Sequence, residues 1–204
     1  MAANRDALSE WSQLHDGYDV DRSRLVRTWL GAMDAIAVPL ARWRVPPTAL
    51  TVTGVVSAGA SLVAPPRVAS LLVLTAATCD GLDGAVARRS GCAGRPRGAL
   101  VDHAADRVTD VLFAAALRHA GAPAWAAATA GIAAVTYESA RSITRRRGPR
   151  LPLVAVGERP MRVAAVVTGI AAAPGAGAIT VTVLSVVSCV QLAVATCSRT
   201  GRDD

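Results

Sequence analysis

One apolar stretch of the chain ends with Asp80-Gly81-Leu82-Asp83-Gly84-Ala85-Val86-Ala87-Arg88, and the next begins with Gly98-Ala99-Leu100-Val101-Asp102-His103-Ala104-Ala105-Asp106. Residues three or four apart share one face of a helix, so Asp80 pairs with Asp83 and Asp102 pairs with Asp106. Two helices joined by a short loop over residues 89–97 would bring the two pairs together. Four carboxylates in a low-dielectric site cannot all stay ionised without cations. Hard divalent ions, which prefer oxygen ligands, are the obvious compensation.

The composition favours a membrane protein. The chain has 204 residues, 52% of them hydrophobic, and its mean hydropathy of +0.36 is high for a soluble domain of this size. The net charge of +7 comes from arginine, since the sequence contains no lysine. Such a charge is typical of nucleic-acid-binding proteins, but that class does not explain the long uncharged runs, so we expect no nucleic-acid partner. Without metal-ligand spacing, the cysteines are expected to be small core residues: Cys79, Cys92, Cys189 and Cys197.

We expect an all-α fold, an integral membrane bundle of six transmembrane helices with an N-terminal amphipathic surface helix over residues 22–44. Arginines at both ends of that helix, with Trp29 and Trp43, suit the membrane surface, although a soluble cap helix remains the alternative. Turns rich in proline and glycine separate six spans of roughly 20 residues. The expected spans are 48–65, 67–88, 98–118, 123–141, 158–173 and 177–198. One domain over 22–198 would then lie between polar tails at 1–21 and 199–204.

The distribution of arginine gives the expected orientation. With six spans, nearly every arginine lies on one side of the membrane, including a predicted basic loop over residues 141–150, and only Arg67 and Arg118 lie on the other. Because positive charge collects on the cytoplasmic side, we place both termini and the acids at the cytoplasmic face of the cell membrane. A water-soluble nucleotide could reach the acids there, while a lipid would enter from the side.

The spacing Asp80-x-x-Asp83-Gly84-x-x-Ala87-Arg88, then nine residues, then Gly98-x-x-x-Asp102-x-x-x-Asp106, resembles the signature of the CDP-alcohol phosphotransferase family. Pro47-Thr48-Ala49-Leu50-Thr51 is similar to the start of that family's first span. The resemblance implies a membrane transferase of phospholipid biosynthesis that moves a phosphatidyl group from CDP-diacylglycerol to a small polar alcohol and releases CMP. It further implies Mg²⁺ or Mn²⁺ at a two-metal site, and a homodimer in the lipid bilayer.

The resemblance also implies roles for single residues. Asp80, Asp83, Asp102 and Asp106 would ligate the metals, and Asp106 would also be the general base. The implied CDP pocket comprises Thr51, Asp80, Gly81, Asp83, Gly84, Ala87, Arg88 and Gly98. The chemistry agrees, because small side chains let a nucleotide approach the backbone and an arginine can bind phosphate with two hydrogen bonds. An alcohol is a poor nucleophile until a base takes its proton.

Gly157-Glu158-Arg159-Pro160-Met161-Arg162 resembles a Glu-Arg-Pro-x-Arg stretch in the actinobacterial phosphatidylinositol-phosphate synthase branch of that family. By this resemblance, Arg141, Arg159 and Arg162 would bind the phosphate of the acceptor, inositol phosphate or glycerol 3-phosphate. That branch has a lysine where this chain has Ser139, a departure that bears on which acceptor is used. Membrane topology alone is the alternative explanation for these arginines.

Other interpretations of the acids lead to different functions. Ion pairs with Arg88, Arg95 or Arg97 would make the acids purely structural. Asp110 continues the row on its helix and would support the site or pair with an arginine. His103 is expected to pack or to form hydrogen bonds rather than to ligate. A small membrane transporter that uses the aspartate rows as a cation path is the alternative function, and it predicts cation flux with no need for a CDP-lipid.

Overall fold

The structure is a computed structural model that describes residues 24–91, 96–147 and 155–200, with side chains over 31–91, 100–144 and 155–198. The predicted tail over residues 1–21 and the last residues of the predicted tail over 199–204 lie outside this part of the chain. The described residues form seven helices and no strand, which confirms the all-α prediction. The helices are α2 (Arg24–Arg42), α3 (Pro47–Ala60), α4 (Pro66–Arg89), α5 (Pro96–His119), α6 (Ala124–Arg147), α7 (Arg159–Ala172) and α8 (Pro174–Thr200).

Proline and glycine set the ends of these helices. Pro47 and Pro66 each occupy the first turn of a helix, where the missing N–H has no intrahelical partner and the fixed φ suits a helix. The predicted turn after α5 is confirmed, with Gly121 at φ 115° and Ala122 N donating to Leu117 O at 2.9 Å. Only glycine adopts such a φ readily, so the chain reverses there.

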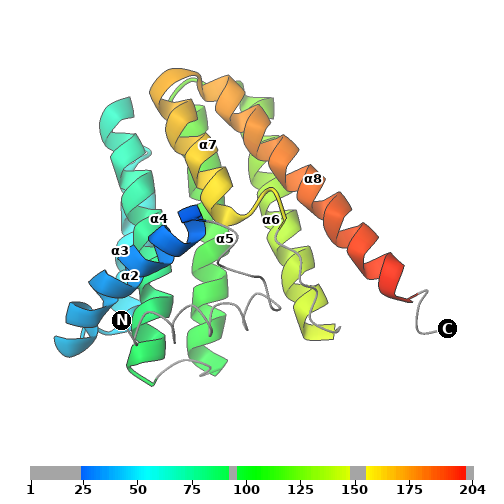
Figure 1. The fold of residues 1–204 in the computed structure, drawn as a ribbon. Helices are drawn as coiled ribbons and strands as arrows, with labels where there is room; N and C mark the ends of the chain where they lie inside the picture. The colour runs from blue at the N-terminus through cyan, green and yellow to red at the C-terminus, as the bar shows by residue number, and fades with distance from the viewer. Residues whose placement is uncertain (1–23, 92–95, 148–154, 201–204) are drawn as a thin grey trace.

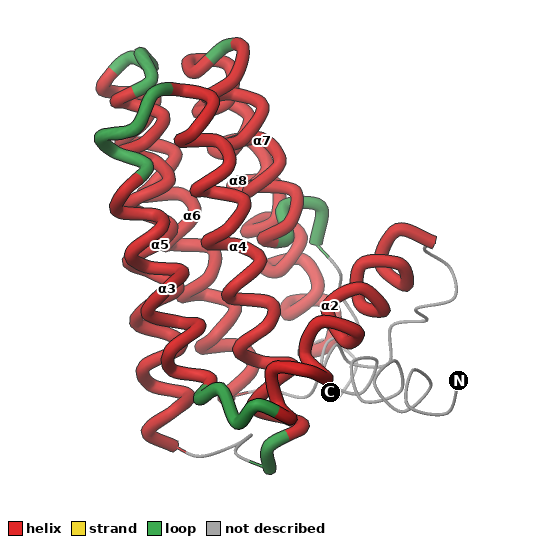
Figure 2. Tube along the Cα trace, turned by 90° about the vertical axis from the view of Figure 1, so that its left-hand side faces the viewer, coloured by secondary structure: helices red, strands yellow, loops and turns green. Residues whose placement is uncertain are grey.

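The helices form a bundle in which the long ones run alongside one another (Figure 1). Neighbouring helices pack α4 against α3 and α7, α5 against α6 and α3, and α8 against α6 and α7. The short α7 begins part-way along the bundle, whereas α6 and α8 continue past its start. The amphipathic α2 lies on the outside, inclined to the others (Figure 2), and packs on α4. The arrangement puts the start of α7 level with the middle of its neighbours.

The core is built mainly from alanine, valine and glycine, which lets helices approach closely. Its buried members come from six helices and include Ala58, Val73, Phe113, Leu117, Ala130, Val166 and Val181. The tightest crossing joins α7 to α8, where a Cβ built on Gly169 would lie 2.8 Å from the Cα of Gly177. No real side chain fits such a gap, so these glycines fix how α7 lies on α8.

Large apolar side chains also cover the outside of the bundle. On α8 alone the exposed ones are Ile179, Val183, Val186, Val187, Val190 and Val194. Such a surface is unusual for a protein in water and fits one in lipid. Among the described helices, Pro66–Arg89 and Pro174–Ser198 are long and apolar enough to cross a membrane by length and composition.

Three predicted segments differ from the structure. The helices α3 and α7 have 14 residues each, about 21 Å at 1.5 Å per residue, so they are shorter than the predicted spans 48–65 and 158–173. A turn over residues 61–64 ends α3 early, whereas α7 ends at Ala172, one residue before its predicted end. The prediction of a basic loop over 141–150 is wrong for residues 141–147, because α6 continues to Arg147. The hydroxyls of Ser142 and Thr144 donate hydrogen bonds to carbonyls four residues earlier in that helix. Both polar side chains therefore have partners within the helix.

Candidate active site

Two of the candidate acids lie in the second half of α4. Asp83 is buried, with 5% of its surface exposed, and Asp80 lies three residues earlier on the same helix. The Thr51 hydroxyl of α3 donates a hydrogen bond to Asp83 Oδ2 at 2.6 Å. This bond holds the carboxylate in place and puts Thr51, a predicted nucleotide contact, beside the acids.

The other two acids lie in the first half of α5. Ligand atoms of Asp102, His103 and Asp106 all lie within 4.8 Å of one another. One arginine nitrogen, Arg159 Nη1, contacts both Asp80 on α4 and Asp106 on α5, so the predicted convergence of the two acid rows is confirmed. The donors are carboxylate oxygens and one imidazole, and the carboxylates suit a hard divalent cation. His103 lies within this group, and its predicted role in packing or hydrogen bonding stays a prediction.

The cation that the structure places on the acids is Arg159, the first residue of α7. Its Nη1 donates hydrogen bonds to Asp80 Oδ1, at 3.0 Å, and to Asp106 Oδ1. Its Nη2 donates to Thr109 Oγ1 at 2.6 Å. One guanidinium therefore bridges α4 and α5. A charge-assisted contact of this kind is among the stronger hydrogen bonds in proteins, and it shows that the acid cluster attracts positive charge.

A second group of ion pairs involves the other two predicted acceptor arginines, Arg141 and Arg162. Arg141 Nη1 donates to Glu158 Oε2 at 2.5 Å. Arg162 is 3% exposed, and its Nη2 donates to Glu138 Oε1 at 2.7 Å and lies 3.8 Å from Asp110 Oδ2. The structure thus brings the three predicted acceptor arginines into one region, each already paired with a carboxylate. Only Arg162 is fully enclosed, because the other two side chains keep 15% and 18% of their surface exposed.

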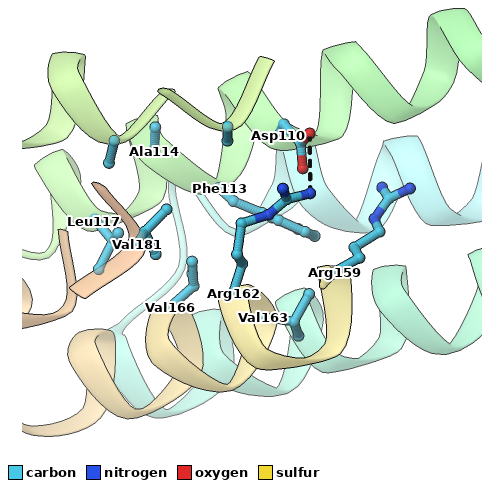
Figure 3. A pocket seen from close by; sticks show the side chains of 11 residues that line it. Asp110, Phe113, Ala114, Leu117, Arg159, Arg162, Val163, Val166 and Val181 are labelled. Carbon is cyan, nitrogen blue, oxygen red and sulfur yellow. Dashed lines mark ion pairs between the residues drawn. The ribbon is translucent and has the colours of Figure 1, made fainter. Parts of the chain in front are cut away.

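A small cavity adjoins the buried pair of Arg162 and Asp110 (Figure 3). Its volume is about 10 Å³, and apolar side chains such as Phe113 and Val166 line its other walls. This is about the space that one water molecule needs, so the cavity cannot hold a substrate. Arg162 Nε and Nη1 and Asp110 Oδ2 are buried there with no hydrogen-bond partner. Asp110 forms an ion pair with Arg162, which agrees with one of the two interpretations of Asp110 from the sequence.

The predicted nucleotide contacts on α4 share that helix with Asp80 and Asp83. A Cβ built on Gly84 would lie 3.5 Å from Arg88 Nη1, and one built on Gly81 would lie 3.5 Å from Met33 Sδ of α2. Ala87 and Arg88 are half-buried. The surroundings of Gly98 and the side chains of Arg95 and Arg97 lie outside the described residues. Nothing in the structure contradicts the predicted CDP pocket, and its roles stay predictions.

Sequence reasoning missed several polar residues that hold this region together. Thr109 lies three residues after Asp106 on α5 and accepts from Arg159, and the periodicity of the acid row could have identified it. Ser188 and Gln191 accept hydrogen bonds from the chain just before α7. Their only sequence signal is a polar side chain within an apolar helix, where polar groups are disfavoured unless bonded.

Comparison with known proteins tests the family. The sequence model of the CDP-alcohol phosphatidyltransferase family matches residues 44–196, well over half of the chain. The chain belongs to this family. CDP-alcohol phosphatidyltransferases are membrane-embedded enzymes that transfer a phosphatidyl group from CDP-diacylglycerol to an alcohol. The assignment to a transferase of phospholipid biosynthesis is confirmed, and the transporter alternative is set aside.

A solved structure shares the fold. The crystal structure of Mycobacterium tuberculosis phosphatidylinositol phosphate synthase (PgsA1) with CDP-DAG bound matches with a TM-score of 0.63 and 24% sequence identity. The match covers 80% of this chain and 92% of that one. No curated protein matches the chain. The solved structure supports the fold of this CDP-alcohol phosphatidyltransferase and leaves its acceptor to be argued from its own residues.

Proposed function

We propose that this enzyme transfers the phosphatidyl group of CDP-diacylglycerol to a hydroxyl of a small phosphorylated polyol, inositol phosphate or glycerol 3-phosphate, and releases CMP. The observation that carries the proposal is the position of Arg159, whose guanidinium contacts Asp106 directly. A residue that touches the general base lies beside the hydroxyl which that base must deprotonate. An arginine there suits an acceptor that carries a phosphate.

The donor is assigned to the α4 side of the acids. Thr51, Gly81, Gly84, Ala87, Arg88 and Gly98 would surround the CDP group, with Asp80 and Asp83. The absence of a Cβ at Gly84 leaves room for a nucleotide against the helix backbone. Arg88 is near enough to Gly84 to reach a phosphate bound there. The diacylglycerol chains would extend into the bilayer along the exposed apolar faces of the bundle.

The acid cluster fits a pair of Mg²⁺ or Mn²⁺ ions. Its donors are oxygen-rich and converge from two helices, and it already attracts the cationic Arg159. Asp80, Asp83, Asp102 and Asp106 would hold the ions, which supply charge neutralisation to the pyrophosphate when bound. The part-buried Thr51–Asp83 bond holds one of these carboxylates in place.

Asp106 is assigned the role of general base. It would take the proton of the acceptor hydroxyl as the hydroxyl oxygen forms its bond to the phosphorus of the phosphatidyl group. The bond from that phosphorus to the bridging oxygen breaks, and CMP leaves with the electron pair. Arg159 and Arg141 would bind the acceptor phosphate. Arg162, which is enclosed, would act behind them by holding Glu138 and Asp110 in place.

The membrane arrangement is part of the proposal. Six passes, with both termini and the acids on the cytoplasmic side, account for the one-sided arginines. A homodimer through the membrane helices follows from the family resemblance. The short α3 and α7 would cross by local thinning of the bilayer or with help from the longer helices packed against them.

A screen of acceptors tests the reaction. Purified protein in detergent with labelled CDP-diacylglycerol and Mg²⁺ is expected to release CMP with inositol phosphate or glycerol 3-phosphate, and far more slowly with inositol or glycerol. Chelation should abolish the release, and added Mg²⁺ or Mn²⁺ should restore it. Equal rates with the phosphorylated and the free polyols would contradict the proposed acceptor class, and no CMP release with any alcohol would contradict the reaction itself.

Replacing Arg159 by glutamine tests the phosphate contact. Arg159→Gln is expected to raise the KM of the phosphorylated acceptor by about 10- to 100-fold, since it removes a charge-assisted contact. The KM of CDP-diacylglycerol should change much less. Arg89→Gln is the matched control, because the described ion pair of Arg89 is with Asp34 at 2.5 Å and not with an acid of the cluster. An equal rise in both KM values would assign Arg159 to the metal cluster rather than to the acceptor.

A further inference from the structure

The segment that leads into α7 is fixed to α8 by two side chains. The Val156 backbone N–H donates to Gln191 Oε1 at 3.1 Å, and the Gly157 N–H donates to Ser188 Oγ at 2.8 Å. Ser188 is fully buried, and its own hydroxyl donates to Leu184 O at 2.8 Å. The Ser188 hydroxyl therefore accepts one hydrogen bond and donates another. The Gly157 bond is buried, and a buried backbone N–H without an acceptor would be unfavourable, so this bond restricts where the segment can lie. The Val156 bond is exposed and adds a second, weaker contact to α8.

The packing at Gly157 makes this contact unusually close. A Cβ built there would overlap Leu184 O and would lie 2.6 Å from Ser188 Oγ. The segment approaches the α8 backbone only because residue 157 has no side chain. Two residues later comes Arg159, on Asp80 and Asp106. Arg159 is thus only two residues along the chain from the hydrogen bond at Gly157.

The next residue along, Glu158, continues the same chain of contacts. Its Oε1 accepts from Ala155 N at 3.3 Å, and its Oε2 accepts from Arg141 at 2.5 Å. The segment is consequently held from α8 on one side and from α6 on the other. A shift of its backbone would move Arg159 and the partner of Arg141 together.

We propose that Ser188 and Gln191 are positioning residues for the acceptor site. They touch no substrate, but through the backbone of Val156 and Gly157 they set where Arg159 stands relative to Asp106. The inference rests on the proposed function, in which Arg159 binds the acceptor phosphate. It also explains why an otherwise apolar helix carries these polar groups. Displacing a substrate-positioning group by about 1 Å is enough to slow an enzyme by up to about 10²-fold.

Two serines on α8 make a matched test. Ser188→Ala removes the anchor, whereas Ser185→Ala removes an equally buried hydroxyl whose described bond is to Val181 O of its own helix. With the phosphorylated acceptor that the wild type uses, Ser188→Ala is expected to raise the acceptor KM about tenfold. The KM of CDP-diacylglycerol should stay within twofold, and Ser185→Ala should leave both values unchanged. Ser188→Thr, which keeps the hydroxyl, should restore most of the loss.

Other outcomes overturn the inference. An unchanged acceptor KM in Ser188→Ala, an equal rise in both KM values, or the same effect in Ser185→Ala would each do so. Should Ser188→Ala fail to fold, as judged by size-exclusion chromatography, Gln191→Leu provides the same reading, and an unchanged acceptor KM there overturns the inference. A wild type that releases no CMP with any alcohol would overturn the proposed function and this inference with it. An active wild type with an unresponsive Ser188→Ala would overturn the inference alone.

Discussion

Asp106→Asn is expected to lower the rate of CMP release from CDP-diacylglycerol by about 10³-fold at saturating acceptor. General-base catalysis contributes roughly 10²- to 10⁴-fold in enzymes, and asparagine keeps the shape of the side chain without its basicity. The substitution also removes one of the charges that Arg159 and the predicted metals share. Labelled CMP, separated from the lipid donor and counted over time, measures the rate.

The control for Asp106 is an acid whose described ion pair is with an arginine that does not contact the cluster acids. Asp34 on α2 pairs with Arg89, so Asp34→Asn removes a carboxylate and an ion pair by the same change of atoms. We expect it to stay within about twofold of the wild type, as a partly exposed pair contributes little. If Asp106→Asn kept a tenth or more of the activity, the hydroxyl would be deprotonated by another group and the role of Asp106 would be wrong.

The acid cluster could be predicted because its geometry is local. Helical periodicity alone pairs Asp80 with Asp83 and Asp102 with Asp106, and the short segment between the two helices limits how far apart the two pairs can lie. The structure confirms that convergence and the all-α fold. Helix starts at Pro47 and Pro66 followed equally local rules.

The partners of the acids could not be predicted in the same way. Arg159 is 79 residues from Asp80 and 53 from Asp106 in sequence, and its position depends on where α8 holds the start of α7. No short-range pattern contains that information. The extent of α6 was wrong for a related reason, since a run of arginines was interpreted as a loop although arginine is a good helix former. The contacts of Ser188 and Gln191 could not be predicted either, because they depend on how α8 packs against α7.

The second large prediction concerns how much the buried Arg162 contributes to the stability of the protein. Arg162→Met is expected to lower the free energy of unfolding by about 3–5 kcal/mol, because it leaves the buried Asp110 and the partly buried Glu138 without their cation. For a chain of this length that corresponds to a fall of about 10 °C in the unfolding temperature. The ring of Tyr137, which lies 5.4 Å from the Arg162 guanidinium carbon, loses a cation–π contact as well. Thermal unfolding of the purified protein in detergent measures the change.

Arg107→Met is the control for loss of an arginine as such, because Arg107 is only half-buried and its described bond is to Ser142 Oγ at 3.1 Å. It should shift the unfolding temperature by less than about 3 °C, in line with surface substitutions. Combining Arg162→Met with Asp110→Asn should lower the unfolding temperature by less than the two single changes added together, since the second removes a charge that the first leaves unpaired. Strict additivity would mean that the two residues do not stabilise one another, and that Arg162 is held in the bundle for contact with Glu138 alone.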